Sequence, residues 1–167
     1  LRYVQQQTSA NSTLHAAATV LECHVMQLIT DVWGNVPYSE SCRLAEGIST
    51  PAYDSQEDIY KSLIVRLKEA SLAFTDENDD LLPDDLLFHG DIDLWRRYAN
   101  ALRLRMAARV AAKDKALASS VFEEVLGNPD LYPLPESNSH NVFYTAWSTD
   151  NPEPWAYNYV GRPSDYC

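Results

Sequence analysis

The sequence predicts an all-α protein in which pairs of long helices are followed by an irregular, aromatic-rich segment. Apolar residues recur at intervals of three and four over four long stretches, which is the period of one helix face. Acidic residues, Gly and Pro fall between these stretches, where helices begin and end. From about Asp130 onward the periodicity is lost, and aromatic residues gather among Pro, Asn and Ser.

The composition is that of an ordinary globular domain and excludes several classes of protein. Of the 167 residues, 46% are apolar and 22% are charged. The net charge of -11 repels phosphate backbones, so nucleic acid is not an expected partner. No apolar run approaches the roughly 20 residues of a membrane helix. The chain starts at Leu1 without a targeting stretch and ends without a closing element, so we expect a piece of a longer protein.

The first helix is expected over about residues 9–33. Gly34 should end it, because glycine readily adopts a positive φ, and Pro37 prevents its continuation. Residues 39–53 are expected to form a connecting loop. The apolar stripe of this helix, which we expect to face the core, consists of Leu14, Ala17, Ala18, Leu21, Val25, Leu28 and Ile29.

The second helix is expected to start at Asp54-Ser-Gln-Glu57. This run places an acceptor side chain at the cap and a Glu three residues later, as in a capping box. The helix should continue to Phe74 and stop in the acidic run of residues 75–80. Residues 81–92 then look irregular.

The third helix follows a cap at Asp91 or Asp93 and is unusually basic. Its core stripe has steps of four, three, four and four and consists of Trp95, Ala99, Leu102, Met106 and Val110. Five of the 13 basic residues lie between these positions, namely Arg96, Arg97, Arg103, Arg105 and Arg109. In so acidic a protein we expect them to pair with carboxylates or carbonyl groups of the same fold. The alternative partner is an anionic sugar such as a uronic acid.

A fourth helix is expected after Asp114, and together with the third it has the spacing of a tetratricopeptide repeat. The large–small–large set of the first helix of that repeat is matched by Trp95, Ala99 and Leu102. The set of its second helix is matched by Ala118, Phe122, Val125 and Pro129. The helix between these two sets is too long for the standard repeat unit of about 34 residues, so the repeat is degenerate. We therefore expect a tetratricopeptide-like region over residues 1–129 and an irregular segment over 130–167, both within one larger domain.

Four stretches of the chain also occur together in one known family. They are 28–40 (LITDVWGNVPYSE), 51–60 with 67–70, 90–95 with 99–109, and 161–165 (GRPSD). In this order and spacing they resemble the SusD/RagB-type outer-membrane glycan-binding lipoproteins, in particular their SusD-like branch. The resemblance extends from Thr13 to the end of the chain.

The resemblance implies a non-catalytic protein on the outer face of a Gram-negative outer membrane. Its implied role is to capture oligosaccharides for a TonB-dependent transporter that it caps. Membrane attachment would come only from a lipidated cysteine outside this chain. Since family members are much longer, part of the ligand-binding face would follow Cys167.

Aromatic residues are the candidate ligand contacts, because Trp and Tyr rings stack on the C–H faces of sugars and also hydrogen-bond. In the irregular segment the candidates are Trp147, Trp155, Tyr157, Tyr159 and Asn158. Alternatively, these aromatic side chains fill gaps beside the helices. A second candidate is the turn with Trp33 and Asn35, either as part of a concave rim or with Trp33 packed at the helix end.

No pattern in the sequence predicts catalysis, a cofactor or a metal site. No pair of carboxylates stands out as a glycoside hydrolase requires. The acidic loop 76–85 does not fit an EF-hand, because Leu87 occupies the twelfth position where Glu is needed. Cys23-His24 with the distant Cys42 lacks zinc spacing, and Cys23 suits a small core position. The alternative function is a tetratricopeptide-like scaffold that grips another protein.

Overall fold

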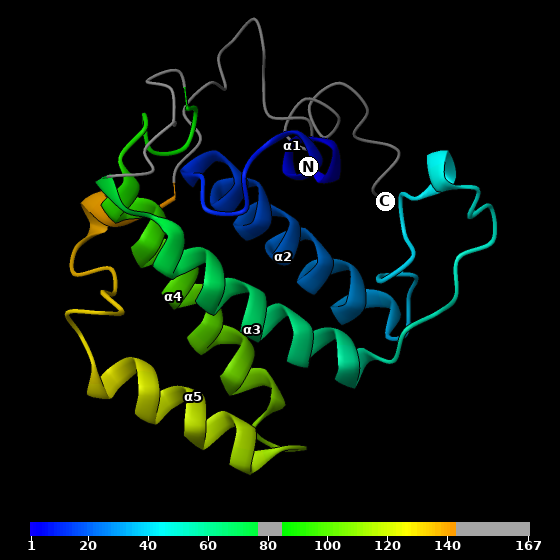
Figure 1. Ribbon diagram of the computed structural model, residues 1–167. Helices are drawn as coiled ribbons and strands as arrows, with labels where there is room; N and C mark the ends of the chain where they lie inside the picture. The colour runs from blue at the N-terminus through cyan, green and yellow to red at the C-terminus, as the bar shows by residue number, and fades with distance from the viewer. Residues whose placement is uncertain (77–84, 143–167) are drawn as a thin grey trace, which may run out of the picture.

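The computed structural model describes residues 1–76 and 85–142, and there it confirms the all-α prediction (Figure 1). Within these ranges the extended backbone pairing amounts to one antiparallel bridge between Val36 and Asp54. The helices are α1 (Arg2–Gln7), α2 (Thr13–Trp33), α3 (Gln56–Ala73), α4 (Ile92–Val110) and α5 (Lys115–Gly127), with short 3-10 turns η1 (Leu44–Glu46) and η3 (Asn138–His140).

The four long helices pack as antiparallel neighbours in chain order (Figure 1). Helix α3 contacts both α2 and α4, and α5 packs on the far side of α4. Helix α1 was not expected from the sequence and lies against α2. Because α2 and α4 run parallel on either side of α3, they occupy equivalent places in two successive helical pairs, as in tetratricopeptide-like proteins.

The core lies between α2, α3, α4 and α5, and the stripe expected for α4 is the face that it buries. Trp95 is 2% exposed, and its indole Nε1 donates to Asp85 Oδ2 at 2.7 Å. The ring stacks on Phe74 with centroids 6.1 Å apart and meets Phe88 edge-on at 5.2 Å. The prediction that Trp95 is a core residue is confirmed.

Polar caps fix where the helices begin, and two of them differ from expectation. Helix α2 starts at Thr13 rather than residue 9, because Ser12 Oγ accepts a hydrogen bond from the amide of His15 at 3.1 Å. Helix α3 is capped by Ser55 rather than Asp54, with a 3.1 Å bond from the Asp58 amide to Ser55 Oγ. These shifts show that neighbouring acceptors compete for the cap, which the sequence pattern does not resolve.

The predicted starts of α4 and α5 and the predicted end of α2 are confirmed. Asp91 caps α4 by accepting from the amides of Asp93 and Leu94, and Asp114 caps α5 through a 2.9 Å bond from the Leu117 amide. Gly34 ends α2 with φ 73°, a conformation that favours glycine.

The stripe expected for α2 is confirmed only in part, because Ala17 and Ala18 are buried and Leu21 and Ile29 pack partly buried against the core, whereas its other members are exposed. Val25 and Leu28 are 48% and 50% exposed. The face toward α3 instead carries smaller and polar side chains, namely Ala16, Val20, Cys23, Gln27 and Thr30. Both faces share the helical period, and the outer face has the larger apolar side chains. Hydrophobicity alone therefore centred the stripe on the more exposed face.

Candidate functional site

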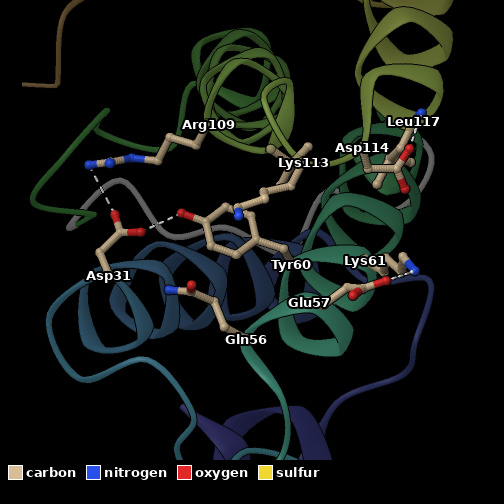
Figure 2. Close-up of a pocket in the computed structure, with 10 residues that line it drawn as sticks. Asp31, Gln56, Glu57, Tyr60, Lys61, Arg109, Lys113, Asp114 and Leu117 are labelled. Carbon is tan, nitrogen blue, oxygen red and sulfur yellow. Dashed lines mark hydrogen bonds and ion pairs between the residues drawn. The ribbon is translucent and has the colours of Figure 1, made fainter.

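A cavity of about 660 Å³ lies where the end of α2, the start of α3 and the connection between α4 and α5 meet (Figure 2). We call it the helix-end pocket. Its volume falls within the range of roughly 300–1,000 Å³ that small-molecule sites occupy. The residues that line it are Asp31, Gln56, Glu57, Tyr60, Lys61, Arg109, Val110, Lys113, Asp114 and Leu117.

Asp31 organises one wall of the helix-end pocket. Its Oδ1 accepts a hydrogen bond from the Tyr60 hydroxyl, and its Oδ2 lies 3.0 Å from Arg109 Nη2 (Figure 2). Burial, together with the bond to Asp31, raises the pKa of Tyr60 to about 12. Tyr60 therefore stays a neutral donor, and the three side chains join α2, α3 and α4.

The other carboxylates of the pocket are also engaged within the protein. Glu57 pairs with Lys61 at 2.5 Å, and Asp114 accepts the Leu117 amide as the cap of α5. Among the described residues, none pairs with the ammonium of Lys113. The pocket thus offers donors and acceptors suited to hydroxyl groups, while each of its carboxylates is already bound by a donor.

Asn35 lies beside the helix-end pocket but has a structural task. Its Oδ1 accepts a hydrogen bond from the backbone amide of Gln56 at 3.0 Å. The Gln56 side chain in turn donates to the carbonyl of Thr30 at 2.7 Å. These bonds tie the turn after α2 to the first turn of α3, where Gln56 forms part of the wall of the helix-end pocket.

Trp33 is 69% exposed at the end of α2, so the interpretation that it packs against the helix end was wrong. It does not line the helix-end pocket. At about 100° per residue, Trp33 lies about 200° around the helix from Asp31 and faces away from it. Tyr53, which the sequence analysis did not single out, is also exposed and precedes Asp54, whose amide donates to the Val36 carbonyl.

The remaining aromatic candidates, Trp147, Trp155, Tyr157, Tyr159 and Asn158, lie outside the described residues. Most of the acidic loop 76–85 lies outside them as well. Within residues 1–76 and 85–142 there is no group of three His, Cys, Asp or Glu side chains placed to hold a metal ion. Cys23 is a core residue as expected, and burial raises the pKa of its thiol to about 12.

The arginines of α4 pair within the fold, as expected. Arg103 Nη2 lies 2.6 Å from Glu124 Oε2, and Arg105 Nη2 donates to Gln27 Oε1 at 2.6 Å. Arg97 pairs with Asp93 and Glu136 and also donates to the carbonyl of Leu134. These bonds join α4 to α2, α5 and the segment after α5.

A second charged cluster surrounds Glu22 on the opposite side of α2. Glu22 Oε1 lies 2.9 Å from Arg2 Nε, and Glu22 Oε2 lies 2.5 Å from Arg66 Nη2. Burial on its own would raise the pKa of Glu22. The hydrogen bonds and charge of Arg66, with further bonds from Gln5 and Arg2, outweigh this and hold the pKa below its ordinary value.

The Glu22 cluster predicts a pH-dependent stability. Because the pKa of Glu22 is lower in the folded state, its contribution is complete above the unfolded value of about 4.3 and is lost as the pH falls through the folded value. Glu22→Gln should therefore lower the urea midpoint at pH 7, and the difference from the parent protein should shrink toward pH 3. Glu69→Gln, on the exposed face of α3, is the control. A difference that stays constant over this range would contradict the assignment.

None of the helices formed by the described residues is both long and apolar enough to cross a membrane.

A family model described as SusD-like, "Starch-binding associating with outer membrane", matches residues 1–167. A solved structure described as a chitin-binding protein is 34% identical, with a TM-score of 0.69 over 78% of this chain and 27% of that chain. A SusD homologue from Bacteroides uniformis is 28% identical, with a TM-score of 0.77 over 90% of this chain and 30% of that one.

A SusD homologue from Bacteroides thetaiotaomicron is 28% identical, with a TM-score of 0.73 over 95% of this chain and 31% of that chain. No curated protein shows significant similarity. The chain therefore spans less than a third of the length of these three solved relatives.

Proposed function

Because the chain belongs to the SusD-like family of starch-binding proteins that associate with the outer membrane, we propose that it captures oligosaccharides there and delivers them unaltered to a TonB-dependent transporter. The observation that carries this proposal is the family match over all 167 residues. One of the solved relatives is described as chitin-binding, and starch and chitin are both chains of pyranose rings. We infer that the ligand here also belongs to this class.

Two exposed aromatic rings are proposed sugar contacts in the described part of the chain. Trp33 and Tyr53 stand in segments joined by the bridge between Val36 and Asp54, and both rings are available for stacking. Trp147, Trp155, Tyr157, Tyr159 and Asn158 remain proposed contacts on the grounds of their chemistry alone. The helix-end pocket is a further place for a sugar hydroxyl group to bind.

The proposed role is binding without chemistry. A glycoside hydrolase needs two carboxyl groups about 5–10 Å apart that are free to exchange protons or attack the sugar. In the helix-end pocket Asp31 is held by Tyr60 and Arg109, and Glu57 by Lys61. Such internally bound carboxylates position hydroxyl groups better than they transfer protons.

The proposed location is the outer membrane, on the cell surface or the periplasmic face, with attachment through a lipid anchor outside these residues. The proposed partners are the oligosaccharide and the TonB-dependent transporter. Neither a cofactor nor nucleic acid has a role in this proposal.

Trp33→Ala in the intact protein, meaning the full gene product that contains these residues, tests the function. Loss of one stacked ring should weaken binding of maltooligosaccharides or chitooligosaccharides by about 2- to 10-fold, measured by calorimetric titration. Trp33→Phe, which keeps a ring, should retain most of the affinity. Leu44→Ala, which removes an exposed side chain that is not aromatic, is the matched control.

Two results would overturn the proposal. One is the absence of binding to any oligosaccharide by the unsubstituted intact protein, combined with tight capture of a protein partner, which would favour the scaffold alternative. The other is the release of shortened sugars during the titration, which would indicate an enzyme.

A further inference from the structure

The outer face of α2 is apolar and exposed in the second half of the helix. Leu21, Val25, Leu28 and Val32 follow one another at steps of four, three and four, so they form one continuous row. Leu21 is half-buried, while Val25, Leu28 and Val32 are 48%, 50% and 70% exposed. We call these four residues the outer stripe of α2.

Paired polar groups border the outer stripe on both sides. On one side Glu22 is bound by Arg2 and Arg66, and on the other Asp31 is bound by Arg109 and Tyr60. Glu22 and Asp31 are the only charged residues of α2, and neither lies in the stripe. Apolar surface rimmed by polar groups marks an interface.

The exposed face of α3 shows what a solvated face looks like in this same fold. Of its six exposed residues four are charged, namely Glu57, Asp58, Lys61 and Glu69, and the other two are Val65 and Leu72. The single apolar side chains there are ordinary for a protein surface. The outer stripe of α2 differs because its apolar residues are consecutive along the helix and no charge interrupts them.

We propose that in the intact protein the outer stripe of α2 is covered by polypeptide of the same protein that lies outside residues 1–167. The solved relatives are more than three times longer than the part that this chain matches, so each carries further polypeptide that must pack somewhere. The absence of charge in the stripe is typical of permanent interfaces, which resemble a domain core cut in half. Polypeptide of the same chain needs no second molecule to cover the stripe, whereas a second copy or the transporter would have to associate first, and interfaces that form reversibly have a composition closer to the ordinary surface.

This inference goes beyond glycan binding and is independent of it. The experiment uses the intact protein with Cys42 and Cys167 replaced by Ser, and it leaves Cys23 in place because that thiol is buried. Val25→Cys and Leu28→Cys report on the outer stripe. Val65→Cys is the matched control, because Val65 is 53% exposed on α3 and so resembles Val25 before any covering.

In the monomeric intact protein, Val25→Cys and Leu28→Cys should react with a maleimide at least about 10-fold more slowly than Val65→Cys, and all three should react equally in denaturant. Hydroxyl-radical footprinting of the unsubstituted protein gives the same comparison without any variant, with Leu28 modified less than Val65.

Equal reactivity of Val25→Cys and Val65→Cys, with equal footprints, would overturn the proposal. Protection that vanishes on dilution to monomer would assign the stripe to a second copy, and protection that appears only with transporter-containing membranes would assign it to the transporter. Both of these results contradict the proposal.

Discussion

Trp95→Ala is expected to lower the free energy of unfolding by about 3–5 kcal/mol, the range measured when a large buried aromatic is truncated. The indole lies between Phe74 and Phe88 and fills the space between α3 and α4. Its loss leaves a cavity and also leaves the Asp85 carboxylate without the indole donor. Urea unfolding of the intact protein, followed by far-ultraviolet circular dichroism, measures the change.

Trp33→Ala is the matched control for this prediction, since it removes the same side chain from an exposed position. It should change the free energy of unfolding by no more than about 0.5 kcal/mol, as is usual for surface substitutions. If both variants lost the same stability, the burial of Trp95 and the exposure of Trp33 would both be in doubt. The pair therefore tests the fold, while the sugar titrations of Trp33→Ala test the function.

Glu124→Ala is expected to have the second-largest effect on stability. Glu124 on α5 binds Arg103 of α4 at 2.6 Å and also binds Lys68 of α3. The Arg103 side chain is 1% exposed, and its guanidinium lies 5.0 Å from the centre of the Tyr132 ring. Removal of the carboxylate leaves a buried charge without its counter-ion, which costs about 3–5 kcal/mol where both partners are fully buried.

Because Glu124 is partly exposed, about 2–3 kcal/mol is the expected loss, and water screens the remainder. Glu123→Ala, one residue earlier on the exposed face of the same helix, is the control and should cost less than about 0.5 kcal/mol. The Glu124→Ala loss should persist in 1 M salt, which screens exposed charges far more than buried ones. Equal losses for the two variants would mean that Glu124 acts only through helix propensity.

The candidate site was predictable only in part. The sequence pointed to Trp33 and Asn35, and the structure places Asn35 against the helix-end pocket and Trp33 on the surface away from it. Asp31, Tyr60 and Arg109 were not identified as a group. One signal was available, because Asp31 is one of only two charged residues in a helix that is otherwise apolar or neutral. Its partners lie 29 and 78 residues away along the chain, and no local pattern links them.

By itself the sequence determined where the long helices lie, which face of α4 is buried, and which family the chain belongs to. These features depend on local periodicity, on cap residues such as Asp91 and Asp114, and on motifs read along the chain. Only the tertiary structure decided which face of α2 is buried and which acidic residue each arginine binds. The physical reason is that both faces of α2 satisfy the helical period, so the choice depends on which side chains of α3 and α4 pack against it.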